Sequence, residues 1–585
     1  MRFGHSHFVT TVLACALTIG SVWSSRPSAD HASSSPPASE ATEQPVGPER
    51  AEAHPFDHAA QAVSDDNPPL LDGLGTLSYR ITTSSPLAQK YFDQGLRLTY
   101  AFNHAEARRA FRKAQRLDPE CALCYWGEAL VLGPNINAPM DPGANAPALE
   151  AVRKAQSVAA KATRREQALI DALAARYSAE TGADRAGLDR AYAEAMGKVA
   201  AKYPKDDDIA VLYAESLMDL SPWDYWESGG AKPKGRTAEI VAVLERVLRR
   251  NPNHPGAIHY YIHMVEASGS PKRAEPYAER LAKLMPGAGH IVHMPAHIYH
   301  RVGRYKDSIE ANRKAVEVDE RYFAKVGRKP GIYSDAYYLH NVHFLMSSAQ
   351  MAGDGRTAIE AAEKLSPLVS DTAAKTMPLV QPIKAAPYFA YAQFSDPNTI
   401  LSLQAPGDEL PYVKAAWHYA RGIANTAKGD TDAALREADA ISRIGRESNF
   451  ADLKAAGIPA GEVLKVADHV IRGRVAQKLG DLRTAAAEFE AAIAVEDKLP
   501  YMEPPFWYYP VRQSLGGVQL MAGDLDLAEQ SFRSTLERTP QNGWALYGLQ
   551  EIYKRRGDTK QLGAVQNRLD RTWLGDKNGP GIDQL

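Results

Sequence analysis

The feature that most limits the fold of this chain is a constant spacing between equivalent glycines. Gly269 and Gly303 are separated by the same stretch of sequence as Gly523 and Gly557. The segment after the glycine also repeats, as GRYKDSIEANRKAVEVD, LGDLRTAAAEFEAAIAVED and AGDLDLAEQSFRSTLERTP. A unit of this size cannot bury its own apolar face, so neighbouring units must stack and share one core. The sequence therefore predicts an all-α solenoid built by repetition.

The spacing matches a helix–turn–helix period of about 34 residues, which, with small residues at helix crossings and proline between units, resembles the tetratricopeptide repeat. The resemblance covers roughly residues 86–573, with interruptions. It implies a right-handed superhelix of roughly eight to ten helix pairs, whose first helices line a concave groove. We expect an N-terminal array over 73–370, a degenerate helix pair or junction over 371–411, a C-terminal array over 412–575 and a tail over 576–585.

The first residues are typical of an exported protein. Arg2 precedes an apolar run over 8–23, and small residues follow, so we expect a signal peptide over 1–25. Residues 26–72 are rich in proline, serine and alanine, which predicts a disordered linker. The expected location is periplasmic or secreted. Cys15 loosely resembles a bacterial lipoprotein box, but the residues after it stay apolar, so a lipid-anchored form is less favoured.

Composition excludes several classes of function. The 68 basic and 70 acidic residues give a net charge of -2, without the basic patch that nucleic-acid binding needs. There is no glycine-rich phosphate loop, so we expect no nucleotide cofactor. Cys121 and Cys124 have CxxC spacing, but Tyr125 follows where covalent c-type haem needs histidine. A disulfide between them, or two small residues packed in a helix, both stay open.

Histidines are concentrated in one part of the chain, with nine of the 17 between His254 and His343. Three segments, which end at Gly269, Gly303 and Gly353, carry polar residues thirteen, ten, six or three places before the glycine. On an α-helix these places fall within an arc of about 80°. The polar residues are His259, His263 and Glu266, then His290, His293, His297 and His300, and finally His340 and His343. Three successive helices therefore each present a histidine face.

Adjacent first helices of such an array lie roughly 8–10 Å apart, so imidazoles from two or three of them can converge. Imidazole and carboxylate ligands suit zinc, iron, copper or nickel. We expect a metal site held by His259, His263, His293, His297 and His343, with Glu215 or Glu266 as the carboxylate ligand. Around the ligands or along the groove we expect Asp208, Asp219, His290, His300, His340, Tyr261, Trp223 and Trp226.

Three alternatives to simple metal binding remain open. The histidines could form a polar groove that binds a peptide without metal, as in an interaction scaffold at the cell envelope. They could be a purely structural hydrogen-bonded network, or the site of a metal-dependent enzyme. The zinc-protease motif HExxH is absent, and no residue pattern identifies a reaction. Convergence of three imidazole nitrogens within about 4–5 Å would favour metal, because zinc–nitrogen bonds are roughly 2.0–2.1 Å long.

Several longer segments resemble a bacterial family of exported tetratricopeptide proteins: FNHAEARRAF, GPNINAPM, HYYIH, HMPAHIYHRVGRY and YYPVRQSLG. The resemblance implies a fold and a compartment but no reaction. The lysine, asparagine and arginine clamp of chaperone-binding tetratricopeptide domains is replaced here by histidines, which disfavours that class of partner. The aromatic segment MEPPFWYYP predicts a packing junction between repeats or, alternatively, a ligand contact beside Arg512.

Overall fold

The computed structural model describes residues 67–180 and 182–585, and these residues fold into an all-α helical array. The predicted signal peptide, Cys15 and residues 26–66 of the predicted linker lie outside the described residues. Within the described part of the chain there is no β-strand, only two isolated bridges. None of its helices is long and apolar enough to cross a membrane.

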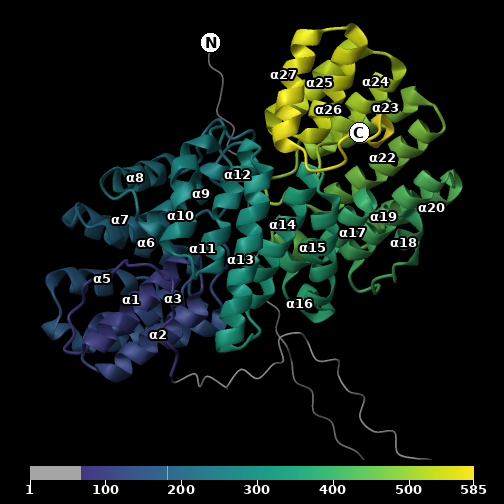
Figure 1. Ribbon diagram of the computed structural model, residues 1–585. Helices are drawn as coiled ribbons and strands as arrows, with labels where there is room; N and C mark the ends of the chain where they lie inside the picture. Colours follow the sequence, from purple (N-terminus) through teal and green to yellow (C-terminus); the bar gives the residue numbers. More distant parts are fainter. Residues whose placement is uncertain (1–66, 181) are drawn as a thin grey trace, which may run out of the picture. The chain divides into compact units, whose positions relative to one another are not determined.

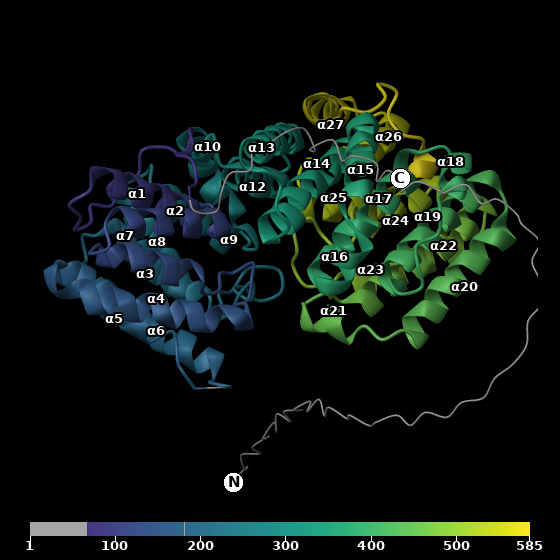
Figure 2. The same cartoon turned by 90° about the horizontal axis from the view of Figure 1, so that it is seen from below.

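Helices follow one another as antiparallel pairs that stack along the chain (Figures 1 and 2). The first part contains α1 (Pro86–Tyr100), α2 (His104–Leu117), α3 (Ala122–Val131), α4 (Asn145–Val158), α5 (Arg164–Ala174), α6 (Arg185–Lys202), α7 (Asp207–Met218), α8 (Thr237–Arg250), α9 (Pro255–Glu266) and α10 (Glu275–Leu284). The middle contains α11 (Gly289–His293), α12 (Pro295–Val302), α13 (Tyr305–Val326), α14 (Tyr338–Ala352), α15 (Gly355–Leu368), α16 (Asp371–Thr376), α17 (Gln381–Phe394) and α18 (Pro397–Ser402). The last part contains α19 (Pro411–Lys428), α20 (Thr431–Glu447), α21 (Ala451–Ala455), α22 (Ala460–Lys478), α23 (Leu482–Glu496), α24 (Val511–Ala522), α25 (Leu525–Arg538), α26 (Gly543–Arg556) and α27 (Thr559–Thr572).

Repeats pack through one recurring large-to-small contact. Phe111 on α2 is fully buried, and Gly95 and Gly127, at equal distances before and after it in the sequence, leave room for its ring. A Cβ atom on Gly127 would stand 2.5 Å from that ring. The same spacing recurs where Phe532 on α25 lies against glycines 516 and 548. Close helix approach at these crossings is what lets successive pairs share one core.

The segment that the repeat pattern predicts as one helix over 289–302 is two helices. Pro295 follows Met294 and has no backbone N–H, so it cannot donate to the carbonyl one turn earlier, and α11 ends before α12 begins. The left-handed conformation of Gly303, with φ of 81°, ends α12. A Cβ atom on Gly303 would stand 1.9 Å from Pro540 O, so this turn needs glycine for a second reason.

The described residues all belong to one compact unit. The last residues of the segment predicted as a linker pack against α1. Tyr91 donates to Pro68 O at 3.0 Å, and Leu71 N donates to Gln94 Oε1 at 2.7 Å. The predicted junction over 371–411 contains the short helices α16 and α18 on either side of α17.

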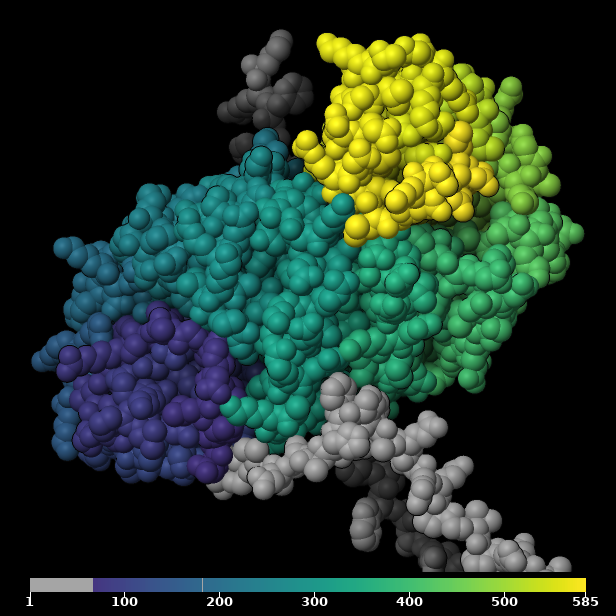
Figure 3. All heavy atoms as spheres, viewed as in Figure 1, coloured from purple at the N-terminus to yellow at the C-terminus, as the bar shows by residue number. Residues whose placement is uncertain are grey.

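The C-terminal repeats turn back onto the middle of the array. The indole of Trp544 on α26 donates to Gln350 O on α14 at 3.1 Å, and Leu574 N donates to Ala352 O at 2.8 Å. Trp573 lies against Gly353 at the end of α14. In the space-filling view these repeats, in yellow, abut the middle of the chain (Figure 3). Segments that are far apart in the sequence are therefore neighbours around α14.

Candidate metal centre

Four neighbouring helices carry the histidines: α9, α11, α12 and α14 (Figure 1). Helix α12 packs against α9, and α11 packs against α12 and α14. Helix α9 begins at Pro255, whose fixed φ suits a first helical position, and His254 Nδ1 accepts a hydrogen bond from Ala257 N at 3.2 Å. All twelve residues of α9 are buried. The histidine faces of these helices therefore lie inside the molecule, whereas the repeat resemblance implies an open groove.

The first histidine group consists of His259 and His263 from α9 and His290 from α11. Their ligand nitrogens lie within 4.8 Å of one another. His259 Nε2 is 3.1 Å from His263 Nε2 and also 3.1 Å from His290 Nε2. The three side chains are at most 2% exposed. Three buried imidazole nitrogens therefore converge on one region of the interior.

Hydrogen bonds at the other ring nitrogen fix two of these imidazoles. His259 Nδ1 is 2.6 Å from the backbone carbonyl of Tyr100, which can only accept, so Nδ1 carries the proton. His263 Nδ1 is 2.8 Å from Glu266 Oε1. With Nδ1 protonated, the Nε2 atoms of both neutral rings present lone pairs toward the same point.

The second histidine group consists of His293 from α11, His297 from α12 and His340 from α14. Its ligand nitrogens also lie within 4.8 Å of one another, and His293 Nε2 is 2.8 Å from His297 Nε2. His293 Nδ1 is 2.6 Å from Asn312 Oδ1. Because the amide nitrogen of Asn312 donates to Ser308 O, its Oδ1 accepts, and His293 Nδ1 is the donor.

A pair of buried carboxylates lies between and beside the two groups. Glu266 Oε1 accepts from His263, and Glu266 Oε2 lies 2.5 Å from His297 Nδ1. Glu503 Oε2 is 3.1 Å from the same His297 nitrogen. Tyr501 donates to Glu503, and Arg301 Nε lies 3.7 Å from Glu503 Oε1. Glu266 thus orients one imidazole of each histidine group.

Burial controls the charge of most of these imidazoles. It lowers the pKa of His259, His263, His290, His293 and His340 well below the ordinary value, and neighbouring histidines lower it further. Burial also opposes the charge of His297, but the carboxylates of Glu266 and Glu503 outweigh it and raise the pKa of His297 to about 10. The first histidine group is therefore neutral at pH 7, as metal ligation requires.

Two strained aromatic residues cover the first histidine group. Phe102 contacts all three of its rings, and the phenyl stacks on the His263 ring with centroids 6.1 Å apart. Trp223 meets the same ring edge-on at 5.2 Å and is 36% exposed. Both residues have positive φ, 55° for Phe102 and 64° for Trp223, which costs of the order of 1–3 kcal/mol each. Backbone strain is thus concentrated where the aromatic rings enclose His263.

The two histidine groups differ from the ligand set that the sequence predicts. His290 and His340, expected beside the ligands, each complete a group of three. His343, expected as a ligand, belongs to neither group, because its Nε2 lies 2.6 Å from the hydroxyl of Tyr508. Burial lowers the pKa of His343 to about 3. His300 points to Ser348 Oγ at 3.4 Å and also lies outside both groups.

Glu215, the other expected carboxylate ligand, belongs to a separate buried cluster. Glu215 lies on α7, and Asp219 is the residue that caps the end of this helix. The Asp219 carboxylate accepts a hydrogen bond from the guanidinium of Arg176 at 2.5 Å. Burial raises the pKa of both carboxyls. Asp208 also faces elsewhere, because it accepts from the hydroxyl of Tyr100 at 2.8 Å. The acidic face of α7 thus pairs with Arg176 and Tyr100 and supplies no member of either histidine group.

Two of the expected groove residues have other partners. Tyr261 donates to Glu245 at 2.8 Å, on the side of α9 that faces α8. The indole of Trp226 donates to Met264 O at 2.7 Å and so fastens its loop to α9. Of the two tryptophans in this loop, only Trp223 contacts a histidine of the two groups through a ring interaction in the described residues.

Several residues at the site had no signal of their own in the sequence. Glu503, Tyr501 and Tyr508 come from the segment between α23 and α24, far beyond α9 in the sequence. The unusual composition of MEPPFWYYP marked this segment, but only as a packing junction or a ligand contact beside Arg512. The Tyr100 carbonyl could not have been found, because every residue has a carbonyl and only the fold brings this one to His259.

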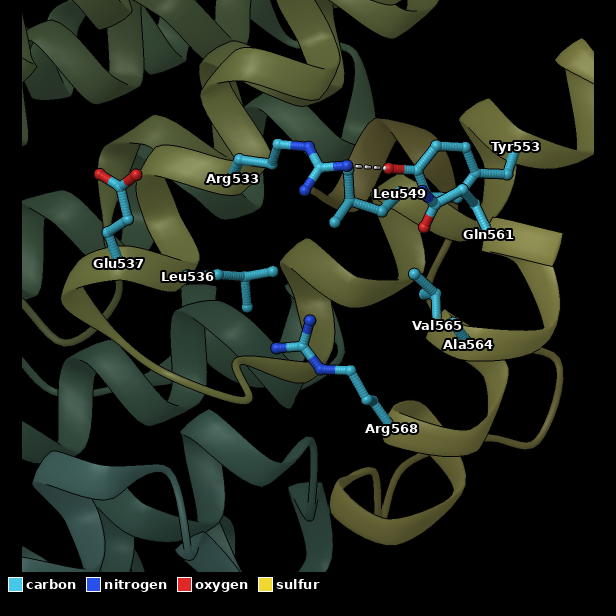
Figure 4. A pocket seen from close by; sticks show the side chains of 9 residues that line it. All are labelled: Arg533, Leu536, Glu537, Leu549, Tyr553, Gln561, Ala564, Val565 and Arg568. Atoms are coloured by element: carbon cyan, nitrogen blue, oxygen red, sulfur yellow. Dashed lines mark hydrogen bonds between the residues drawn. The ribbon is translucent and has the colours of Figure 1, made fainter. Parts of the chain in front are cut away.

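A disulfide and two cavities lie away from the histidine groups. Cys121 and Cys124 form a disulfide at the start of α3. A cavity of about 300 Å³ lies among α25, α26 and α27, where Arg533 donates to the Tyr553 hydroxyl at 2.8 Å and Arg568 lines the other side (Figure 4). Another of about 400 Å³ lies beside α4. Neither cavity is lined by a histidine.

Comparisons with known proteins give no assignment of function. No family model matches the chain, and no curated protein matches it. Among solved structures, the chain is similar to a human IFIT1 dimer with m7Gppp-AAAA, with 15% identity, a TM-score of 0.32 and coverage of 77% of this chain and 89% of that one. It is similar to yeast Tom70, with 12% identity, a TM-score of 0.27 and coverage of 82% and 92%. It is also similar to Naa15/Naa10 bound to HypK, with 12% identity, a TM-score of 0.22 and coverage of 85% and 90%. Likeness at this level transfers no ligand or partner, so the exclusion of nucleic acid stays a prediction.

Proposed function

We propose that this chain is a metal-binding helical-repeat protein that holds a divalent transition-metal ion at the first histidine group. One observation carries the proposal: His259 Nε2 lies 3.1 Å from the Nε2 atoms of both His263 and His290. These are hydrogen-bond distances, but the partners are all ring nitrogens.

The protons available do not satisfy these contacts. His259 and His263 each use the Nδ1 proton on an acceptor, so two lone pairs face each other across 3.1 Å. His290 could donate from Nε2 to His259, but no second proton remains for the contact between His259 and His263. Buried polar atoms without partners are rare in folded proteins and costly.

A bound cation resolves the conflict. It would accept all three lone pairs, and neutral imidazole is the commonest ligand that proteins offer to zinc, copper, nickel and iron. Two nitrogens 3.1 Å apart, each about 2.1 Å from one ion, subtend roughly 95° at it, which is close to an octahedral angle. The acceptors at Nδ1, a carbonyl for His259 and a carboxylate for His263, are the usual outer partners of metal-bound histidines.

The peptide-groove alternative fits this geometry less well. The first histidine group is at most 2% exposed, and Phe102 and Trp223 lie over it, so an extended peptide could not reach the ring nitrogens. A protein or peptide partner elsewhere on the array stays a prediction. Membership of the bacterial exported family is a further part of the proposal, supported by the Cys121–Cys124 disulfide, because disulfides persist in oxidising compartments.

A metal-dependent enzyme is the second candidate, and the number of ligands favours it. Each group offers three imidazoles, and three protein ligands leave a position for water or substrate, as in catalytic zinc sites. The buried Tyr337 lies beside the first histidine group, with its ring centroid 4.8 Å from that of His290. Its phenolic hydroxyl is a group that can donate or accept a proton in such a site.

Metal content tests the proposal. Untagged protein purified without chelators is analysed by mass spectrometry, beside His259→Gln and a matched control, His469→Gln. His469 pairs with Glu488 on α22 and α23 and belongs to neither group. We expect at least one zinc, iron, copper or nickel ion per chain in the wild type and the control, and one ion fewer per chain in His259→Gln. Absence of metal from all three proteins, even after incubation with each ion, would rule out the proposal.

A further inference from the structure

The second histidine group, like the first, brings three imidazoles together, and the metal ion proposed above does not occupy it. His293 Nδ1 is held by Asn312 and His297 Nδ1 by Glu266, so both Nε2 atoms are directed at each other across 2.8 Å. The His340 nitrogen completes the group within 4.8 Å. We infer that this group binds a second divalent transition-metal ion, and that the protein therefore carries a two-ion centre.

A proton is the competing occupant. A charged His297 imidazolium, balanced by Glu266 and Glu503, would donate from Nε2 to His293 and satisfy that pair without metal. Such a pair needs no third imidazole. His340 nevertheless lies against both rings, with centroids 4.8 Å from His293 and 5.6 Å from His297. Among the described residues no hydrogen bond holds His340, so its nitrogens are free to bind a metal.

Glu266 links the two groups. One carboxylate oxygen accepts from His263 in the first group, and the other lies against His297 in the second. The rings of His263 and His297 have centroids 5.5 Å apart, and those of His290 and His293 lie 5.9 Å apart, so the groups are neighbours. Glu266 would orient a ligand of each ion at once, as carboxylates behind metal-bound histidines do.

The local charges suit two cations better than none. Glu266 is fully buried and Glu503 is 6% exposed. Within the described part of the chain, Arg301 is the only cationic side chain other than histidine that pairs with either carboxylate. Two divalent ions on six neutral imidazoles would have these two carboxylates as their nearest buried anions. Ionised carboxylates in a dry interior need such compensation.

This inference rests on the proposed metal-binding function, and its test separates the two. Chelator-treated protein is titrated with Co²⁺, and bound ion is counted by visible absorption and by mass spectrometry after gel filtration. The variants are His259→Gln for the first group, His340→Gln for the second, and the control His469→Gln. His340 is the partly exposed member of its group, so its replacement disturbs the fold least. Circular dichroism verifies that each variant is folded.

We expect two ions per chain in the wild type and the control, one in His259→Gln and in His340→Gln, and none in a variant that carries both of these substitutions. Glu266→Gln should lower the metal affinity of both sites by roughly 10–100-fold. This variant replaces His340→Gln as the test if His340→Gln does not fold. One ion in the wild type, lost in His259→Gln and kept in His340→Gln, would overturn the second ion while the proposed function stood. One ion lost in both variants would also overturn it, because all six histidines would then serve one site. No ion in any protein would overturn both.

Discussion

At the scale of single residues, the contact between His259 and His263 is the decisive feature. Two neutral imidazoles whose outer nitrogens both donate have no proton to share at their inner nitrogens, and the Tyr100 carbonyl and Glu266 accept from both outer nitrogens. Either residue alone would be an ordinary buried histidine. Their joint geometry is the basis of the proposed metal site.

Trp223 should report on that cation. Its indole meets the His263 ring edge-on at 5.2 Å, and open-shell ions such as Cu²⁺ quench a nearby indole efficiently. Adding Cu²⁺ to metal-free protein should therefore lower tryptophan fluorescence, and Trp223→Phe should remove most of the change although seven of the eight tryptophans remain. Undiminished quenching in the variant, measured at the same copper content, would place the ion away from His263.

At the scale of helices, pairing depends on the phenylalanine between two glycines. Phe532 is fully buried on α25 against glycines 516 and 548. Phe532→Ala should reduce the free energy of unfolding by about 3–5 kcal/mol, because it leaves a cavity that the facing helices cannot close. Urea unfolding measures the loss. The exposed Leu527→Ala on the same helix is the control, and a similar loss there would contradict the packing account.

An ion-pair cluster on α25 and α26 predicts a pH dependence. Burial acts to raise the pKa of Glu529, but hydrogen bonds from Tyr553, Arg556 and Arg533 outweigh it and lower the pKa to about 2. The unfolded chain binds this proton near the ordinary value of about 4.5, so the stabilisation is present above that pH and is lost as pH falls toward 2. The stability advantage of the wild type over Glu529→Gln should thus disappear between these values. Equal advantage at pH 6 and pH 3 in urea unfolding would contradict the assignment.

Much of the structure at the scale of helices could be predicted from the sequence. The glycine period indicated the all-α array, and the closing glycines marked where α12 and α14 end. Helical spacing also put the histidines on one face of each helix. It could not say which faces meet, because that depends on how α9, α11, α12 and α14 pack against one another in the folded chain. The sequence predicts His290 and His340 beside the ligands and His343 among them, whereas in the structure His290 and His340 each complete a histidine group.

At the scale of the whole molecule, the site is completed by parts of the chain that are distant in sequence. Glu503 reaches His297 from the segment before α24, and Tyr100 contributes its carbonyl from the end of α1. No pattern within a repeat predicts such contacts, because they arise only from packing between distant elements, such as that of α1 against α9.

Metal binding should consequently stabilise the entire compact unit. An ion that binds only the folded state at one hundred times its Kd adds about 2.7 kcal/mol. Removing metal with a chelator should lower the thermal unfolding midpoint, and titrating metal back should raise it progressively. The midpoint of His259→Gln should respond much less. A wild-type midpoint that ignores metal, in a sample where binding is verified, would contradict a folded-state site.

The most direct test of the central claim is anomalous diffraction from crystals of protein loaded with zinc or copper, with data on both sides of the absorption edge of the metal. The account predicts a peak about 2.0–2.3 Å from the Nε2 atoms of His259, His263 and His290. A well-ordered interior without a peak there, or metal bound only at surface histidines such as His469, would contradict it.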